Sequence, residues 1–272
     1  MQAFPAKWTP PTGVLGRIIH ETSRRVATAR ARRPDLEKRA RTADRAPEFI
    51  TALRGDRVKV IAEVKRRSPS RGEINAELDP ASRAREYQRG GAAAISVLTE
   101  PSHFAGSEED LVHVRAVVDV PLLRKDFIID ETQIIEARAW GASAVLLIAR
   151  ALPETDLRAL AQAARDWEVE PLIEVRSREE LDAALRAQAR VVGVNSRNLE
   201  TLEVDARAVD RLLPLVPQEI IAVAESGMQS VADVERAAEA GADAVLIGSS
   251  LSSSATAESA VRALTGVQRR GR

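Results

Sequence analysis

The stretch VKVIAEVK, at residues 58–65, is the first of a series of short apolar runs that recur along the rest of the chain. Each run is followed by a polar turn and an amphipathic stretch. The eight runs are VKVIAEVK (58–65), AAAISVL (92–98), VPLLRK (120–125), SAVLLI (143–148), PLIEV (171–175), VVGVN (191–195), IIAVAE (220–225) and DAVLIG (243–248). They are nearly continuous in apolar residues, which is typical of strands that are covered on both faces. Their spacing leaves room for the crossover helices that parallel strands require.

The segments between the runs carry helical signals. Residues 79–92, 131–142 and 230–242 each begin at a polar capping candidate and end at a glycine before the next run. Residues 152–167 and 177–188 repeat apolar positions at the helical period. Eight such units in about 250 residues predict an α/β fold, a (β/α)8 TIM barrel. A doubly wound open sheet is the structural alternative, because it uses the same alternation.

Residues 1–57 stand outside this rhythm. One apolar face predicts a helix over about 14–33 and is formed by Val14, Leu15, Ile18, Ile19 and Val26. Nine arginines lie between residues 17 and 45, a bias also found in RNA-binding segments and transit peptides, but acidic residues are interspersed among them. We therefore expect a helical extension over 1–57 that packs on the barrel of 58–272, the two forming one structural domain.

The chain is expected to end loosely. Residues 252–259, SSSATAES, have the composition of a polar linker, and the remaining residues predict a short last helix and a frayed end.

Composition argues against several functional classes. Forty basic and forty acidic residues give a net charge of zero, which argues against a dedicated nucleic-acid or anionic membrane surface. The absence of cysteine excludes thiol chemistry, and His20, His103 and His113 lack metal-ligand spacing. No run approaches the roughly 18 apolar residues of a membrane span, and residues 1–11 lack the layout of a signal peptide. We therefore expect a cytoplasmic protein without a bound metal.

Lysine is scarce in this chain. Only five of the forty basic residues are lysines, and two of these, Lys65 and Lys125, close apolar runs. Arginine keeps its proton in essentially any protein site. A lysine can release its proton when burial and neighbouring cations lower its pKa. The placement of these two lysines therefore predicts proton chemistry at the strand ends.

Other polar residues close the predicted strands, where a barrel of this kind holds its active site. They are Glu63 with Lys65, Lys125, Glu174, Asn195 with Arg197, Glu225 with Ser226, and Gly248 with Ser249. Glu63 and Lys65 are two residues apart, so their side chains point the same way. Buried carboxylates are costly unless they pair with each other or with a ligand. The set predicts either a catalytic site or a structural ring of ion pairs, and its size favours catalysis.

Three motifs suit an anion. ESG (225–227) and IGSS (247–250) end the seventh and eighth strands, where barrels often bind phosphate through backbone N–H groups and a short helix. RRSPSRG (66–72) is a loop by composition, and its cations and hydroxyls suit phosphate or carboxylate.

Seven motifs together resemble the indole-3-glycerol phosphate synthase family. They are EVKRRSPSRG, SVLTEPSHFAGS, LLRKDFIID, PLIEV, VGVNSRNLETLEVD, AESG and LIGSSL, and the resemblance covers about residues 14–265. It implies a (β/α)8 barrel with an extra N-terminal helical segment. It also implies ring closure of 1-(2-carboxyphenylamino)-1-deoxyribulose 5-phosphate to indole-3-glycerol phosphate in tryptophan biosynthesis, with loss of carbon dioxide and water and without a cofactor.

The resemblance also implies roles for individual residues. Lys125 matches the family's general acid, Glu174 an acid/base for dehydration, and Lys65 the lysine that holds the substrate's carboxylate. Glu63 and Asn195 match groups that orient the lysines and the substrate hydroxyls. The implied substrate contacts are Arg197 and Glu225 in the same pocket, Ser68, Ser226, Gly227, Gly248 and Ser249 on the phosphate side, and Phe104, Phe127 and Leu147 around the aromatic ring. The implied partners are the phosphorylated substrate and other enzymes of the tryptophan pathway.

Two other functions use similar residues. One is another phosphate-binding barrel enzyme, such as phosphoribosylanthranilate isomerase or an aldolase that forms a Schiff base through Lys125. The other is a ligand-binding barrel without catalysis. The presence of Lys65, Lys125 and Glu174 together favours the synthase over a binding module.

Overall fold

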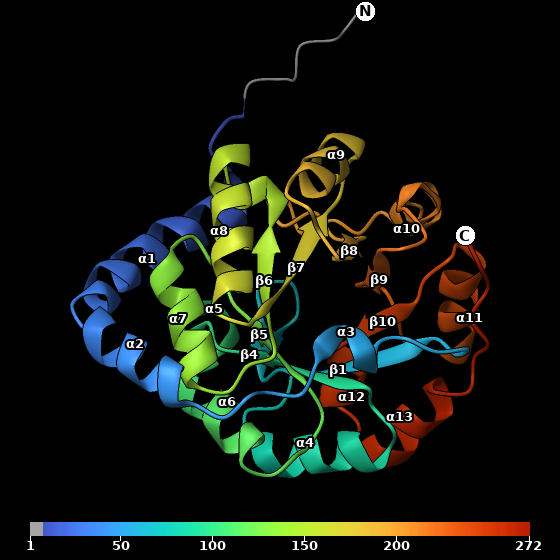
Figure 1. The fold of residues 1–272 in the computed structure, drawn as a ribbon. Helices are drawn as coiled ribbons and strands as arrows, with labels where there is room; N and C mark the ends of the chain where they lie inside the picture. The colour runs from blue at the N-terminus through green and yellow to red at the C-terminus, as the bar shows by residue number, and fades with distance from the viewer. Residues whose placement is uncertain (1–7) are drawn as a thin grey trace, which may run out of the picture.

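The computed structural model describes residues 8–272 and contains a closed barrel of eight parallel strands (Figure 1). The strands are β1 Lys59–Val64, β4 Ala94–Leu98, β5 Leu122–Lys125, β6 Ala144–Ile148, β7 Glu170–Val175, β8 Val191–Asn195, β9 Ile221–Glu225 and β10 Ala244–Ile247. Each strand pairs with the preceding strand in the chain, and β10 pairs with β1 to close the barrel. Each of the eight apolar runs forms one of these strands. The predicted (β/α)8 barrel is therefore confirmed, and the doubly wound sheet is excluded.

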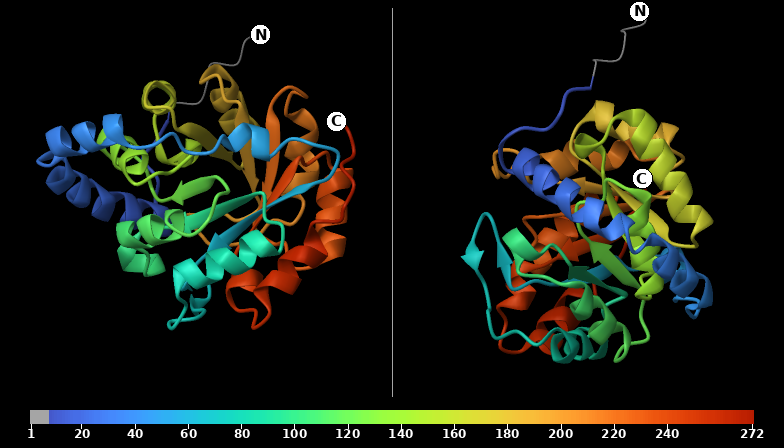
Figure 2. Two further views of the ribbon diagram at one scale, coloured as in Figure 1. Left: turned by 60° about the horizontal axis from the view of Figure 1, so that its bottom comes forward. Right: turned by 90° about the vertical axis from the view of Figure 1, so that its left-hand side faces the viewer.

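Helices surround the barrel (Figures 1 and 2). They are α4 Pro80–Arg89, α5 Pro101–Phe104, α6 Glu108–Arg115, α7 Glu131–Ala139, α8 Glu154–Asp166, α9 Arg178–Arg186, α10 Ala208–Leu212, α11 Val231–Glu239, α12 Ser249–Ser252 and α13 Ala257–Leu264, with 3-10 turns η1 Ala149–Ala151 and η2 Leu213–Leu215. The predicted capping signals are present, because Asp79, Asp130 and Ser230 accept backbone N–H groups at the starts of α4, α7 and α11. The helices cover strands that are almost entirely buried.

The N-terminal segment is helical, and its first two helices lie along one side of the barrel (Figures 1 and 2). It contains α1 Gly13–Arg30, α2 Arg33–Thr42 and α3 Phe49–Ala52. The helix predicted over 14–33 therefore ends early, at Arg30. After a turn, α2 begins at Arg33 with Pro34 in its first turn, a position that proline favours. Leu15 and Phe49 belong to the same buried core as the strands. Residues 1–7, including Lys7, lie outside the described part. The division at residue 57 stays a prediction, and the shared core supports the expectation that both parts form one structural domain.

Three further expectations about local structure are wrong. The stretch 66–72, predicted as a loop, contains most of a short hairpin, formed by β2 Arg67–Ser68 and β3 Gly72–Glu73. The C-terminus is not frayed, because the Arg272 guanidinium is 3% exposed, donates to the Ile220 carbonyl at 2.6 Å and pairs with Asp243 at 2.9 Å. Helix α13 also begins inside the stretch expected to be a linker.

The described helices, from residue 8 onward, include none long and apolar enough to cross a membrane.

Candidate functional site

A cavity of about 460 Å³ opens at the carboxyl ends of the barrel strands. Every predicted site residue except Leu147 lines it: Glu63, Lys65, Ser68, Phe104, Lys125, Phe127, Glu174, Asn195, Arg197, Glu225, Ser226, Gly227, Gly248 and Ser249. The strands converge on this opening, so residues from most of the chain meet in one space. The sequence therefore identified the walls of the cavity, while the roles of these residues stay predictions.

Leu147 does not line the cavity. Neighbouring residues of a strand point to opposite faces, and on β6 it is Leu146 and Ile148 that line the cavity. Ile148 lies beside Glu174 in the β6–β7 register, and both face inward. Leu147 is fully buried on the other face. The register with Glu174 would have identified the correct face.

Lys125 lies among three buried carboxylates at the end of β5. Its Nζ is 3.6 Å from Glu225, 3.8 Å from Glu174 and 4.0 Å from Glu63. The second lysine, Lys65, pairs with Glu63 at 2.5 Å. These side chains come from β1, β5, β7 and β9, or directly follow β1, so the closed barrel brings them together. The arrangement supplies a mobile proton and several acceptors within a small buried space.

The carboxylates set the proton affinities of this cluster. Burial alone would lower the pKa of Lys125, but Glu225, Glu174 and Glu63 raise this pKa above its ordinary value. The expectation that burial and neighbouring cations lower it is therefore wrong for Lys125, because its neighbours are three carboxyl groups, all ionised at the high pH where Lys125 would lose its proton. Burial would also raise the pKa of Glu63, but Lys65 and Lys125 lower it overall. Burial raises the pKa of Glu225 to about 8, with Lys125 opposing this effect and Glu174 adding to it.

The raised pKa of Glu225 predicts a pH-dependent stability. This carboxyl holds its proton up to about pH 8 in the folded protein, against an ordinary value of 4.5. Its contribution to stability is therefore complete below pH 4.5 and is lost as the pH rises towards 8. The variant Glu225→Gln stays neutral, so it should gain stability relative to the native protein across this range, on the order of a few kcal/mol.

Urea denaturation at pH 5, 6.5 and 8 measures this gain. Glu235→Gln, which alters an exposed residue of α11, is the control and should follow the native curve. If the free energy of unfolding varies with pH in the same way for Glu225→Gln and the native protein, Glu225 does not hold a proton up to about pH 8.

Two glycines make room for the charged cluster. A Cβ at Gly248 would overlap the Glu63 carboxylate and lie 2.8 Å from the Lys65 Nζ. A Cβ at Gly193 would overlap the Glu225 carboxylate and lie 2.9 Å from Leu172. Sequence reasoning assigned Gly248 to substrate binding and missed Gly193. A glycine inside an apolar strand run is a signal of close approach by another group.

We expect Gly193→Ala to destabilise the protein by about 1–3 kcal/mol, the cost of overpacking a filled core. The same change should displace Glu225 from Lys125 and reduce activity. Gly266→Ala is the matched control, because nothing lies within 4 Å of a Cβ built there. Chemical denaturation of the two variants provides the test, and equal stabilities would show that Gly193 has no packing role.

Buried hydrogen bonds hold the first strand in place behind the cluster. The Glu63 carbonyl accepts from the Tyr87 hydroxyl at 3.2 Å and from the Ser252 hydroxyl at 2.9 Å. Ser252 also accepts the backbone N–H of Lys65 at 3.2 Å. Sequence reasoning missed both residues, because Tyr87 lies within helix α4 and Ser252 at the end of helix α12, away from the strand ends.

The β9 and β10 ends form a polar corner of the cavity. Ser226 and Gly227 both have positive φ, which turns the chain sharply after Glu225. Gly248 is the N-cap residue of the short helix α12. The Ser250 hydroxyl, which sequence reasoning did not select, is buried there without a hydrogen-bond partner among residues 8–272. A buried unpaired hydroxyl beside a cavity is a group that a polar ligand can satisfy.

Helix α1 also contributes to the site. Its backbone N–H groups at Val14 and Leu15 donate to the segment after β8, and Val14 and Ile18 line the cavity. Sequence reasoning assigned this apolar face to packing alone. The ring centroids of Phe104 and Phe127 lie 6.0 Å apart on the apolar side of the cavity.

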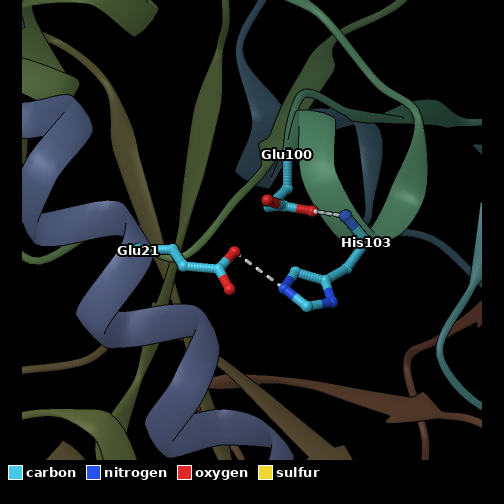
Figure 3. A group of neighbouring side chains, drawn as sticks. All are labelled: Glu21, Glu100 and His103. Carbon is cyan, nitrogen blue, oxygen red and sulfur yellow. Dashed lines mark hydrogen bonds and ion pairs between the residues drawn. The ribbon is translucent and has the colours of Figure 1, made fainter.

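A cluster of Glu21, Glu100 and His103 joins α1 to the segment that carries Phe104 (Figure 3). His103 Nε2 lies 2.9 Å from the Glu21 carboxylate. Glu100 accepts three backbone N–H groups at the start of α5, and the Arg25 guanidinium lies 3.9 Å away. Since Glu100 already has three hydrogen-bond donors and a nearby cation, the cluster fits a structural link better than a metal site.

Comparisons with known proteins identify the family. A family model described as Indole-3-glycerol phosphate synthase matches residues 15–264. Indole-3-glycerol phosphate synthase 1 of Streptomyces coelicolor is 49% identical over 240 residues, covering 88% of this chain and 89% of the relative. The synthase of Kineococcus radiotolerans is 55% identical over 194 residues, or 71% of each chain. A thiamine phosphate pyrophosphorylase from Pyrococcus furiosus has a similar fold, with a TM-score of 0.57 at 18% identity over 76% of this chain and 93% of that one. This chain therefore belongs to the indole-3-glycerol phosphate synthase family.

Proposed function

We propose that the charged side chains at the barrel mouth divide the steps of indole ring closure between them. The enzyme is a carboxy-lyase of tryptophan biosynthesis and forms indole-3-glycerol phosphate from 1-(2-carboxyphenylamino)-1-deoxyribulose 5-phosphate. The observation that carries the proposal is the position of Lys125, within 4.0 Å of three buried carboxylates beside the cavity.

Lys125 is the general acid of the first step. The ring carbon that bears the carboxylate attacks the ketone, a carbon–carbon bond forms, and the former carbonyl oxygen gains negative charge. The Lys125 ammonium transfers a proton to this oxygen, which becomes a hydroxyl. Loss of carbon dioxide from the same ring carbon then restores the aromatic ring. The raised pKa of Lys125 keeps its proton in place until the more basic alkoxide forms.

Glu174 serves the second half of the reaction. The new hydroxyl must leave as water, and a proton must leave the adjacent CH₂ carbon to complete the indole double bond. These transfers need an acid and a base close to the same atoms. Glu174 lies 3.8 Å from Lys125, so one carboxyl and one amine can exchange protons with the same part of the substrate.

The remaining residues hold the two anionic ends and the ring of the substrate. Lys65 binds the carboxylate, and Glu63 and Asn195 orient the lysines and the substrate hydroxyls. The phosphate is bound by backbone N–H groups and hydroxyls at the β9 and β10 ends, with support from the unpaired Ser250 hydroxyl. The proposed phosphate contacts are Ser68, Ser226, Gly227, Gly248 and Ser249, while Arg197 and Glu225 line the pocket and Phe104 and Phe127 contact the aromatic ring.

Supplying the carboxyphenylamino-ribulose phosphate and following indole fluorescence tests the proposed function directly. Purified enzyme should produce fluorescent indole-3-glycerol phosphate together with one equivalent of carbon dioxide. Treatment with borohydride in the presence of substrate should leave Lys125 unmodified. A covalent adduct at Lys125, with no indole formed, would instead favour the aldolase.

We also propose that the enzyme acts in the cytoplasm and takes its phosphorylated substrate from other enzymes of the tryptophan pathway. Family membership supports this setting, since the substrate is an intermediate of that pathway.

A further inference from the structure

Two arginines face the cavity without an acidic partner. Arg71, from the β2–β3 hairpin, and Arg197, after β8, both line the cavity. Within residues 8–272, no carboxylate oxygen lies within 4.0 Å of either guanidinium. Arg197 donates one N–H to the Leu202 carbonyl at 2.8 Å, which leaves most of its donors unused. The cavity therefore has an unneutralised positive region in addition to the Lys65 and Lys125 cluster.

The hairpin presents Arg71 at a defined position. The Arg71 backbone N–H donates to the Ser68 carbonyl at 3.3 Å, which closes a turn with Pro69 at its second position. Gly72 follows with φ near +67°, so the chain reverses directly after Arg71.

A salt bridge holds the base of this hairpin. Two N–H groups of Arg66 bind Asp110 at 2.5 and 2.9 Å, and the Arg66 carbonyl accepts the Ile74 N–H at 2.8 Å. This bidentate pair joins the hairpin to helix α6. The hairpin therefore does not need Arg71 itself for its anchoring.

The electrostatics of the two arginines favour an anion. Burial lowers the pKa of Arg197, and the charge of Arg71 lowers it further. The two like charges are thus close enough to repel each other across the cavity. An anion placed between them would relieve this repulsion and accept the free donors.

We propose that Arg71 is a further substrate-binding residue, which contacts an anionic group of the bound substrate together with Arg197. This inference rests on the proposed function, because that substrate carries both a carboxylate and a phosphate. The guanidinium can bind either anion. Substrate and product distinguish the two cases, because the product keeps the phosphate and has lost the carboxylate.

The test compares Arg71→Ala with Arg67→Ala. Arg67 lies on the same hairpin and is exposed, but it does not line the cavity. Replacing Arg67 therefore removes the same charge without removing a contact to the substrate. We expect Arg71→Ala to raise the KM for the substrate by about 10- to 100-fold, the range of one charge-assisted hydrogen bond, with little change in kcat. Arg67→Ala should stay within about twofold of the native KM. Arg71→Lys should recover part of the affinity.

Inhibition by indole-3-glycerol phosphate then identifies the anion. If Arg71 contacts the phosphate, Arg71→Ala weakens binding of product and substrate alike. If it contacts the carboxylate, only substrate binding weakens. Equal KM values for Arg71→Ala and Arg67→Ala would overturn the proposal. The unsubstituted enzyme is measured in the same assay. If the proposed function is wrong, this enzyme shows no turnover, so that failure can be distinguished from a failure of the Arg71 proposal.

Discussion

Replacing Lys125 by arginine should lower kcat by about 10²- to 10⁴-fold, the usual contribution of a positioned general acid. The substitution keeps the positive charge that Glu225, Glu174 and Glu63 surround, so the fold should survive. Arginine cannot deliver the proton that neutralises the alkoxide, because its own proton is retained in essentially any site. Steady-state kinetics by indole fluorescence measure the loss, and circular dichroism checks the fold.

Two matched variants make this result specific. Lys65→Arg should retain more turnover than Lys125→Arg, because a guanidinium can still bind a carboxylate. Lys59→Arg, at the opposite end of β1 and away from the cavity lining, should behave like the native enzyme. Near-normal turnover in Lys125→Arg would eliminate Lys125 as the general acid.

Local patterns in the sequence predicted the barrel well, because each strand leaves its own signal. A strand buried on both faces must be apolar along its length, so runs such as VVGVN at 191–195 are visible without any knowledge of their partners. The two-residue alternation also places Glu63 and Lys65 on one side of β1. Both lie on the cavity wall.

The continuous apolar character of these strands also explains the error at Leu147. Within a fully apolar run, the inward and outward faces are chemically alike, so neither face is marked. Only pairing with the strand that contains Glu174 distinguishes Ile148 from Leu147. Such pairing depends on register, which the sequence does not display.

Other features depend on contacts between distant segments. The buried Arg272 is held by carbonyls around residues 216–220 and by Asp243. No local sequence pattern predicts these partners. The raised pKa of Lys125 likewise depends on three carboxylates from three other strands. The sequence identified these charged groups, but the balance between burial and attraction appears only when their distances are known.

Glu174→Gln should separate the two halves of the reaction. The amide keeps the shape of the side chain, so we expect KM to change by only a few-fold, while indole formation falls by about 10²- to 10⁴-fold. Ring closure and decarboxylation, which use Lys125, should continue through the first turnover. In a single-turnover experiment with substrate labelled in its carboxylate, labelled carbon dioxide should therefore appear well before indole fluorescence.

The control for this experiment is Glu203→Gln, which alters an exposed carboxylate outside the cavity lining. It should release carbon dioxide and form indole at native rates. Equal slowing of both signals in Glu174→Gln would place Glu174 in ring closure, and unchanged indole formation would remove it from the mechanism. Only a delay between the two signals agrees with a role in dehydration, because carbon dioxide leaves before water does.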